Sequence, residues 1–521
     1  MKKLYIYTLL CFFIILSSCQ DILDVENKNG INQHNNYQTS TDLAINIVGI
    51  YSGIQEIMPS VILFNGLRSD EMGIDESASP QIRSIYNYME LSTNSYVDPT
   101  KFYKVIVNCN DFLKNANVFE QRRDEVSLKN YQACIGEVHR IKYWCYWMIA
   151  KIYGEVYIFD ESFETDFEVQ KIKDMTPFTL QEVIPELIKV LEDPSYHWDK
   201  KINWQQLVDE PKAIYNYYGI EHQVLLGDLY LWNKEYKKAA NIFYKYLTIG
   251  SIGWGDLIGE NEDLFGHQNY IQLYKKTIQT CGKKLIGVSE YNHKFEQYNS
   301  LYALFNRGEI IAGQGYLNII ESQKNTENST GDLYRKFIDN ENKIWKYNFE
   351  KKGFLNTLQN RIIIYKDSEL YMKLIECLNE MGDSETALVL LNQGAQEYYD
   401  EDTKVFAPPF HKNNISDNGI WDEIWGMNSG IRQRVSLTPR VFPNEADDNK
   451  KQELLRQWIL EENAMEFAFE GKRFEDLIRF SLREGTTNII AQTVAMKYPE
   501  SERNTIRSKL SDINNWFWPI E

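Results

Sequence analysis

The stretch Leu454–Phe480, LLRQWILEENAMEFAFEGKRFEDLIRF, constrains most strongly how this chain can fold. Its apolar side chains recur at broadly helical spacing, and a second amphipathic run begins at Phe474. Gly471 lies between the two runs, where glycine commonly ends a helix. The pattern therefore predicts a helical hairpin that turns at Gly471.

Three glutamates, Glu462, Glu466 and Glu470, recur every four residues in this stretch. Such a stripe of like charge destabilises an isolated helix, so it must face solvent or cations. The nearest cations across the turn are Lys472, Arg473, Arg479 and Arg483. A solvated acidic face is the commoner explanation, but bulky apolar residues flank the stripe on both sides. We therefore predict a partly buried carboxylate–arginine lock in which Glu466, Glu470 and Arg473 are structural.

A helix-pair repeat signal lies at 223–243. Leu226-Gly227-x-x-Tyr230, followed by Ala239 and Phe243, matches the tetratricopeptide pattern. The two small residues would let the helices cross closely, while Tyr230 and Phe243 fill the adjoining hollows. A weaker copy spans 371–391, and a third helix with matching offsets ends at Tyr153. Because the copies are not tandem, the sequence predicts a mostly α, single domain built on interrupted helix pairs.

Two long segments interrupt this scaffold, which covers about 38–250 and 360–521. The first insertion, about 251–359, mixes Gly, Asn and aromatic residues with a short strand-like run at 284–288. The second, about 400–450, contains four prolines and two tryptophans. Long irregular insertions in compact domains are usually functional or disordered, and these are too aromatic for disorder alone.

The composition limits the function. The chain has 521 residues, 43% of them hydrophobic, which is ample for a packed core. Its net charge of −18 excludes nucleic acid as a partner, because no basic footprint is present. The seven cysteines are too few and too scattered for a disulfide framework, so buried free thiols are expected.

The N-terminus indicates an anchored protein. Two lysines precede the apolar run Leu4–Leu16, which is shorter than the ~20 residues of a membrane span and reads as a signal peptide. The run ends in Leu16-Ser17-Ser18-Cys19, which resembles the bacterial lipobox, in which the cysteine is acylated and becomes the mature N-terminus. The alternative is an ordinary signal peptide with an incidental cysteine, but the abrupt polarity after Cys19 favours lipidation. We predict a signal peptide at 1–18 and a lipidated tether at 19–37, whose acidic start is similar to surface-export signals of Bacteroidetes lipoproteins.

The C-terminal stretch resembles the signature of the SusD/RagB family of outer-membrane nutrient-binding lipoproteins. The matching positions are Ile459, Glu462, Glu466, Phe467, Phe469, Glu470, Gly471, Arg473, Asp476, Leu477 and Arg479. Asn463 departs from the pattern, because the family usually has arginine there. The ending Asn515-Trp516-Phe517-Trp518-Pro519-Ile520 is similar to the closing motif of the family, so the resemblance extends from the lipobox to the last residues.

The resemblance implies a SusD-like domain over 38–521, on a lipid-anchored protein exposed at the surface of the outer membrane. It implies a lid on a TonB-dependent SusC-like β-barrel transporter, to which the protein delivers an oligosaccharide. RagB-like relatives take peptides, so a peptide ligand is the alternative. A second alternative is a tetratricopeptide scaffold lipoprotein of outer-membrane assembly, and a third is a surface hydrolase.

The aromatic residues suggest where a ligand would bind. They make up 14% of the chain, and helix packing explains most of them. Those outside the helical pattern are candidates for a sugar-stacking platform, with Arg68, Asp70 and Asn87 as polar partners. These candidates are Tyr86, Tyr88, Tyr96, Trp254, Tyr291, Tyr298, Tyr302, Trp421 and Trp425. The residues 62–100 lose the helical periodicity and are here called the early segment. The resemblance places the ligand where this early segment meets the first insertion.

The sequence contains no pattern typical of catalysis. No Gly-rich phosphate loop, G-x-S-x-G elbow or H-E-x-x-H motif occurs, and the seven histidines are isolated from one another and from cysteine. A pair of glycosidase carboxylates cannot be recognised without the tertiary structure. We therefore predict a non-enzymatic binder with no cofactor and no metal.

Overall fold

The computed structural model describes residues 37, 39–90, 94–120, 125–162, 172, 174–208, 218–249, 285–292, 297–326, 329–347, 359–395, 399–400, 405–406 and 430–520. The proposed lipidation site Cys19, with the whole predicted leader and nearly all of the tether, lies outside these residues. So do Trp254, Trp421 and Trp425, three of the candidate ligand-binding aromatics.

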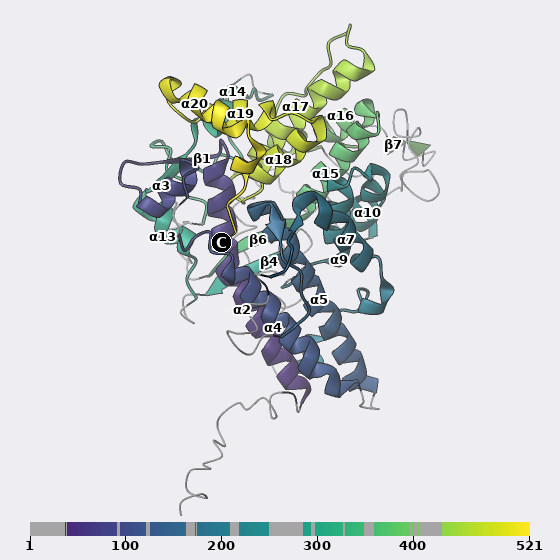
Figure 1. Ribbon diagram of the computed structural model, residues 1–521. Coiled ribbons are helices and arrows are strands. Elements are labelled where there is room, and N and C mark those ends of the chain that lie inside the picture. Colours follow the sequence, from purple (N-terminus) through teal and green to yellow (C-terminus); the bar gives the residue numbers. More distant parts are fainter. Residues whose placement is uncertain are drawn as a thin grey trace, which may run out of the picture.

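The fold is mostly α, as predicted (Figure 1). The α-helices are α2 (Ser40–Arg68), α3 (Pro80–Tyr86), α4 (Thr100–Asn115), α5 (Glu125–Tyr153), α7 (Leu180–Leu191), α8 (Trp204–Leu207), α9 (His222–Trp232), α10 (Tyr236–Ile249), α13 (Ser300–Arg307), α14 (Gln314–Ser322), α15 (Asp367–Glu380), α16 (Ser384–Asn392), α17 (Asp448–Glu466), α18 (Arg473–Glu484), α19 (Asn488–Ala495) and α20 (Glu500–Leu510). Short 3₁₀ helices lie at Ala116–Phe119, Pro194–Tyr196, Gln433–Val435 and Ile513–Trp516. The strands are β1 (Met72–Ile74), β2 (Glu155–Val156), β3 (Phe178–Thr179), β4 (Leu285–Asn292), β5 (Ile310–Ala312), β6 (Gln359–Lys366), β7 (Tyr399–Asp400) and β8 (Val405–Phe406).

Successive helix pairs pack into one array. Helix α5 packs on α7, α7 on α9, α9 on α10, α10 on α15 and α15 on α16, so that neighbours in space come from both sides of the first insertion. At the α9–α10 crossing a Cβ on Gly227 would lie only 2.6 Å from Cε1 of Phe243. This is the close approach that the sequence pattern predicted. Stacked helix pairs of this kind are typical of repeat scaffolds.

Helix α2 is longer than its sequence periodicity suggests. The amphipathic pattern fades near residue 62, but the helix continues to Arg68, past Pro59. Every residue from Ile57 to Arg68 is buried. A helix enclosed on all sides has no polar face, so it shows no 3.6-residue period. Among the described helices, α2 alone is long and apolar enough to cross a membrane, yet 67% of its most apolar window is buried in the core.

The described part of the first insertion is ordered and joins the scaffold through two-stranded sheets. Strand β1 pairs antiparallel with β5, matching Met72 with Ala312, and β4 pairs antiparallel with β6, matching Glu290 with Arg361. The predicted strand-like run corresponds to β4 (Leu285–Asn292). The partner strands are far apart in sequence, so local patterns could not reveal either pairing.

The C-terminal hairpin forms, but its turn begins earlier than predicted. Helix α17 starts after Asp447, whose carboxylate accepts the backbone N–H of Lys450, and it ends at Glu466. The next residues leave the helix, and both Phe469 and Gly471 have positive φ angles, 61° and 75°. The expected helix stop at Gly471 is therefore wrong by five residues. Glu470 lies in the turn rather than in a helical stripe.

The four cysteines in the described part of the chain, Cys109, Cys134, Cys145 and Cys377, are buried free thiols. Burial raises the pKa of the Cys109 thiol to about 12, so this thiol stays protonated and unreactive at neutral pH.

Candidate functional site

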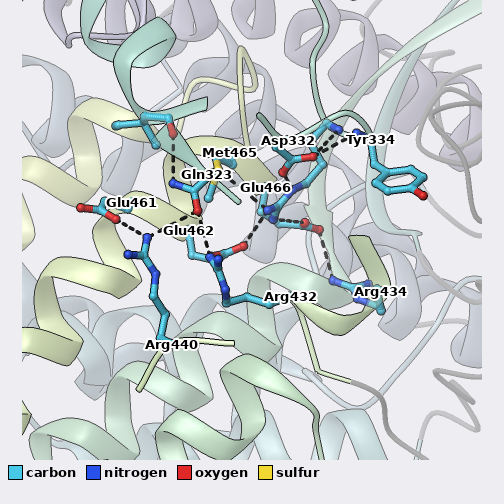
Figure 2. A network of polar contacts seen from close by, with 12 residues as sticks. Gln323, Asp332, Tyr334, Arg432, Arg434, Arg440, Glu461, Glu462, Met465 and Glu466 are labelled. Carbon is cyan, nitrogen blue, oxygen red and sulfur yellow. Dashed lines mark hydrogen bonds and ion pairs between the residues drawn. The ribbon is translucent and has the colours of Figure 1, made fainter. Parts of the chain in front are cut away.

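The carboxylates of α17 bind cations from both insertions (Figure 2). Arg335, in the first insertion, donates to Glu462 at 2.7 Å and to Glu466 at 3.2 Å, and its Nε lies 2.6 Å from Asp332. Arg432, in the second insertion, donates to Glu462 at 2.7 Å, and Arg434 lies 3.6 Å from Glu466. The carboxylates therefore fasten the two insertions to the same helix.

The ion pairs of Glu462 and Glu466 are here called the ionic frame, and Glu470 extends this frame into the turn. It accepts hydrogen bonds from Lys346 and from Lys366, each at 2.8 Å. Burial alone would raise the pKa of Glu470, but the two ammonium groups lower it to about 2. The cations nearest in sequence have other partners: Arg473 pairs with Asp70, and Arg479 pairs with Glu376 and Asp476. The carboxylates are buried and paired, but with cations far along the chain rather than with Arg473.

Asp70 is positioned where the early segment meets the first insertion. Its two carboxylate oxygens accept from Nε and Nη2 of Arg473 at 2.7 and 3.0 Å. Its backbone oxygen accepts the N–H of Tyr316 at the start of α14. A Cβ on Gly313 would lie 2.4 Å from that backbone oxygen, and a Cβ on Gly315 would lie 2.5 Å from Cβ of Asp70. The two glycines therefore allow α14 to lie directly against Asp70.

Asp70 and Arg473 form the floor of a cavity of about 610 Å³ between α14, α17, α18 and α19, here called the α17–α19 cavity. Its apolar wall consists of Ile319, Leu460, Phe480, Ile489 and Met496. The volume lies within the range of about 300–1,000 Å³ that is usual for ligand pockets. Helix α14 packs on α17, and α18 on α19, so rigid elements form the walls.

Polar groups with spare hydrogen-bonding capacity line the same cavity. Gln457 on α17 and Gln492 on α19 are exposed, and neither side-chain amide has a partner within the described chain. Asn318 accepts from Gln314 at 2.8 Å, which leaves its own N–H groups available. Amide groups can both donate and accept, so together with the apolar wall they suit a ligand that has hydroxyl or peptide groups.

Charged residues of both signs form the rim. Arg456 holds Glu380 through two bonds of 2.8 Å and lies 3.0 Å from Glu484. Glu461 pairs with Arg440, and Glu453 pairs with Lys450 at 2.9 Å. The rim is therefore polar and nearly balanced in local charge, although the chain as a whole is acidic.

Three predicted ligand residues, Arg68, Tyr86 and Tyr88, lie together in a different place. The Arg68 guanidinium lies 4.0 Å from the ring centroid of Tyr88, and the Lys497 ammonium lies 4.3 Å from that of Tyr86. Tyr86 also packs on Tyr498 with centroids 4.9 Å apart. Arg68 and Tyr88 are 3% and 5% exposed, so these groups form an internal cation–aromatic cluster at the C-terminal end of α2.

The remaining predicted ligand residues are dispersed. Tyr291 is buried on β4, and its hydroxyl donates to the backbone oxygen of Gln55 at 2.7 Å. Tyr96 and Tyr302 are half-buried, while Tyr298 is 65% exposed. Of the predicted ligand residues that the structure describes, Asp70 lines the α17–α19 cavity and the others do not.

The residues of α17 that line the cavity were not predicted from the sequence. Glu453, Gln457, Leu460 and Glu461 recur at intervals of four, three and one, which places them on one side of the helix. This face lies beside the glutamate stripe, whose run of like charge is the more conspicuous pattern in the sequence. The cavity also needs α14 and α19, which no local pattern connects with α17.

Glu71, next to Asp70, provides a pH-dependent prediction. Burial raises the pKa of its carboxyl to about 8, despite the N–H of Phe469, which donates to Oε1 at 2.7 Å, and the nearby Lys346. The folded state therefore holds a proton between pH 4.5 and 8 that the unfolded state releases, so stability falls as pH rises through this window. The slope from this one group is at most about 1.4 kcal/mol per pH unit.

We expect Glu71→Gln to remove that slope, because glutamine keeps the acceptor for Phe469 and cannot ionise. Urea unfolding at pH 5, 6.5 and 8 should show the variant gaining stability relative to the parent as pH rises. The exposed Glu445→Gln is the matched control and should follow the parent. Parallel curves for Glu71→Gln and the parent would contradict the assignment.

Comparison with known proteins identifies the class. Residues 418–521 match the model of the SusD family. A SusD-like protein of Formosa agariphila is 20% identical over 504 residues, covering 89% of this chain and 88% of the relative. The matched residues include both the ionic frame of α17 and the cavity face of that helix.

Solved structures share the fold over nearly the whole chain. A SusD superfamily protein from Bacteroides vulgatus superposes with a TM-score of 0.59 at 13% identity, covering 92% of this chain and 96% of that one. A SusD-like carbohydrate-binding protein from Bacteroides fragilis gives a TM-score of 0.53 at 13% identity, covering 90% and 93%. The fold is that of the SusD superfamily. The family match at the C-terminus and the full-length relative both support similarity of this chain to the SusD/RagB family.

Proposed function

We propose that this protein is a nutrient-binding lipoprotein at the outer-membrane surface, which holds an oligosaccharide in the α17–α19 cavity and delivers it to a TonB-dependent SusC-like barrel. The match to the SusD family model and the name of the carbohydrate-binding protein of similar fold support this class of function. The observation that supports the site is the junction of Asp70 with α14. There the early segment meets the first insertion and a cavity of about 610 Å³ opens.

The lining favours a neutral, hydroxyl-rich ligand. Gln457 on α17 and Gln492 on α19 both line the cavity, and their amides can donate hydrogen bonds to hydroxyl groups or accept them. Leu460, Ile489 and Met496 offer apolar surface to the C–H faces of a sugar ring. The acidic chain, with a net charge of −18, disfavours polyanionic glycans at low salt.

We infer binding without cleavage. Glycoside hydrolysis requires one carboxyl that can give up a proton and a second that stays ionised. The carboxylates of this cavity are each paired with a cation: Asp70 with Arg473, Glu484 with Arg456, Glu461 with Arg440 and Glu453 with Lys450. Each carboxylate that lines this cavity in the described chain is therefore already engaged in an ion pair.

One observation favours a peptide as the alternative ligand. The rim carries both signs of charge, and the ring of Phe480 is fully buried, so it offers no exposed face for sugar stacking. A short peptide could bond the amides through its backbone and find counter-charges at the rim. Sugars and peptides must therefore be tested side by side.

The test is a glycan and peptide array probed with the mature protein, followed by titration of the strongest ligand. We expect the double variant Gln457→Ala/Gln492→Ala to weaken binding about 5- to 150-fold, since two hydrogen bonds of about 0.5–1.5 kcal/mol each would be lost. Gln206→Ala, an exposed change of the same kind on α8, should bind like the parent. Unchanged affinity in the double variant would remove the ligand from this cavity.

Anchoring and delivery require their own test. We propose cleavage before Cys19, a tether at 19–37 and a domain at 38–521 that contains two ligand-binding insertions. Cys19→Ala removes the residue that would carry the acyl chains. Because stable anchoring needs two or more such chains, the variant should move from the membrane fraction to the soluble fraction. Co-purification of the lipidated form with a β-barrel would support delivery. A soluble parent protein would refute the anchor.

A further inference from the structure

A second cavity, separate from the first, lies where the end of α5 meets the start of α7 and the C-terminal tail. It has a volume of about 410 Å³ and is here called the α5–α7 cavity. Its lining includes Glu155 of β2, Gln181 of α7, and Phe517 and Trp518 of the tail. No residue that lines it also lines the α17–α19 cavity.

The backbone around this cavity is firmly held. The N–H of Trp518 donates to the backbone oxygen of Ile152 at 3.0 Å, and the N–H of Leu180 donates to that of Gly154 at 2.7 Å. Gly154 adopts a positive φ of 77°, and a Cβ there would lie 2.7 Å from Cγ of Phe517. Glycine at this position therefore lets the aromatic tail pack directly on the end of α5, which fixes one wall of the cavity.

One donor in this wall has no partner within the described part of the chain. The indole Nε1 of Trp516 donates to the backbone oxygen of Leu510 at 2.9 Å. The indole Nε1 of Trp518 has no acceptor among the described residues and remains accessible to solvent, although the residue as a whole is only 7% exposed and lines the cavity. This N–H is therefore available to donate to an acceptor atom of a ligand in the cavity.

The charge of the lining limits what that ligand can be. Glu155 and Glu90 line the cavity, and no lysine or arginine of the described residues does. Glu90 also lies within the electrostatic range of Lys509, so Glu155 is the carboxylate more available to a ligand. An anion is therefore disfavoured here, whereas a neutral or cationic group is favoured. Half-buried Phe517, with Leu482 and the 44% exposed Ile513, adds apolar surface.

We propose that the α5–α7 cavity is a second binding site, which takes one pyranose unit of a neutral sugar or an amino sugar. A ring hydroxyl accepts from Nε1 of Trp518, hydroxyl or ammonium groups donate to Glu155, and the C–H face of the ring packs on Phe517. Gln181 and Asn514 supply further polar contacts at the edge. Such a site would hold a glycan at a second point, independently of the α17–α19 cavity.

The experiment is ligand-observed saturation-transfer NMR on the purified mature protein, titrated with glucosamine, glucose and glucuronate. Affinity for a single sugar at an open site should lie near the millimolar range. We expect glucosamine to bind more tightly than glucose, and glucuronate to give no measurable transfer. Absence of transfer from both glucosamine and glucose up to about 50 mM would overturn the proposal.

Two conservative variants locate the site. Trp518→Phe keeps an aromatic ring but removes the N–H, and should weaken both sugars about 3–10-fold, which is the worth of one hydrogen bond. Glu155→Gln should remove most of the preference for glucosamine while leaving glucose within about twofold. Because Glu155 is on a half-exposed edge strand, this variant remains informative if the change at Trp518 lowers stability.

The first cavity provides the matched control. Gln457→Ala/Gln492→Ala should leave the binding of both monosaccharides unchanged. If that double variant abolished their binding, while Trp518→Phe and Glu155→Gln did not, the sugars would be bound in the α17–α19 cavity and the second site would be refuted. Failure of the array experiment on the first cavity would not affect this outcome, so the two proposals can fail separately.

Discussion

Replacing Arg335 with methionine is expected to lower the free energy of unfolding by about 3–5 kcal/mol, the cost of removing one partner from a buried ion pair. Arg335 is fully buried and bonds Asp332, Glu462 and Glu466, which are themselves 0–2% exposed. Methionine fills a similar volume but leaves three carboxylates with less compensation. Chemical unfolding at neutral pH, followed by circular dichroism, measures the loss.

The matched control is Arg307→Met, because Arg307 is paired with Glu309 but is 56% exposed. Exposed pairs contribute little, so this variant should change stability by less than about 1 kcal/mol. The prediction about Arg335 would be contradicted by a loss as small as that of the control. Such a result would mean that Arg432, Arg434 and Lys366 compensate the carboxylates without it.

The ionic frame illustrates what local sequence can and cannot reveal. The spacing of Glu462, Glu466 and Glu470 and their apolar neighbours were enough to predict burial with cations. The partners could not be predicted, because Arg335 and Lys346 lie more than a hundred residues upstream. Pairing of this kind depends on how the insertions fold back on α17, and no periodicity encodes it.

The fold class was predictable for a related reason. Helix pairs such as α9 and α10 are local, and their small and large residues at fixed spacing specify a crossing, as Gly227 and Phe243 do. Helix α2 shows a helical period only over its first half, since burial on every side removes the period that marks a surface helix. The strands were mostly missed because β1 needs β5 and β4 needs β6 to form.

The candidate site was predicted in location more than in composition. Asp70 does lie where the early segment meets the first insertion. The aromatic residues chosen with it were selected for being outside helical patterns, but Tyr88 and Tyr291 are buried against protein partners. Irregular sequence does not distinguish a loop that is packed from one that is open. The amides of Gln457 and Gln492 could be recognised only once the fold showed that α17 and α19 line the same cavity.

Replacing Asp70 with alanine is expected to produce the second large effect, because Asp70 supports both the fold and the floor of the α17–α19 cavity. The change leaves the buried guanidinium of Arg473 without its bidentate partner and should cost about 3–5 kcal/mol. Ligand binding should be lost as well, since Arg473 would be free to leave its position between Asp70 and the backbone oxygen of Leu460.

A double variant separates these two roles. Asp70→Leu/Arg473→Met replaces the ion pair with apolar groups of similar size, and such replacements are often nearly neutral for stability. We expect it to recover most of the stability that Asp70→Ala loses, while the ligand found on the array still fails to bind. Recovery of both stability and binding would mean that the pair only holds α18 against the early segment, and that the polar contacts to the ligand come entirely from the walls. Recovery of stability alone would assign Asp70 and Arg473 to the binding surface, because the shape of the cavity would then be restored and only its charged floor would be missing.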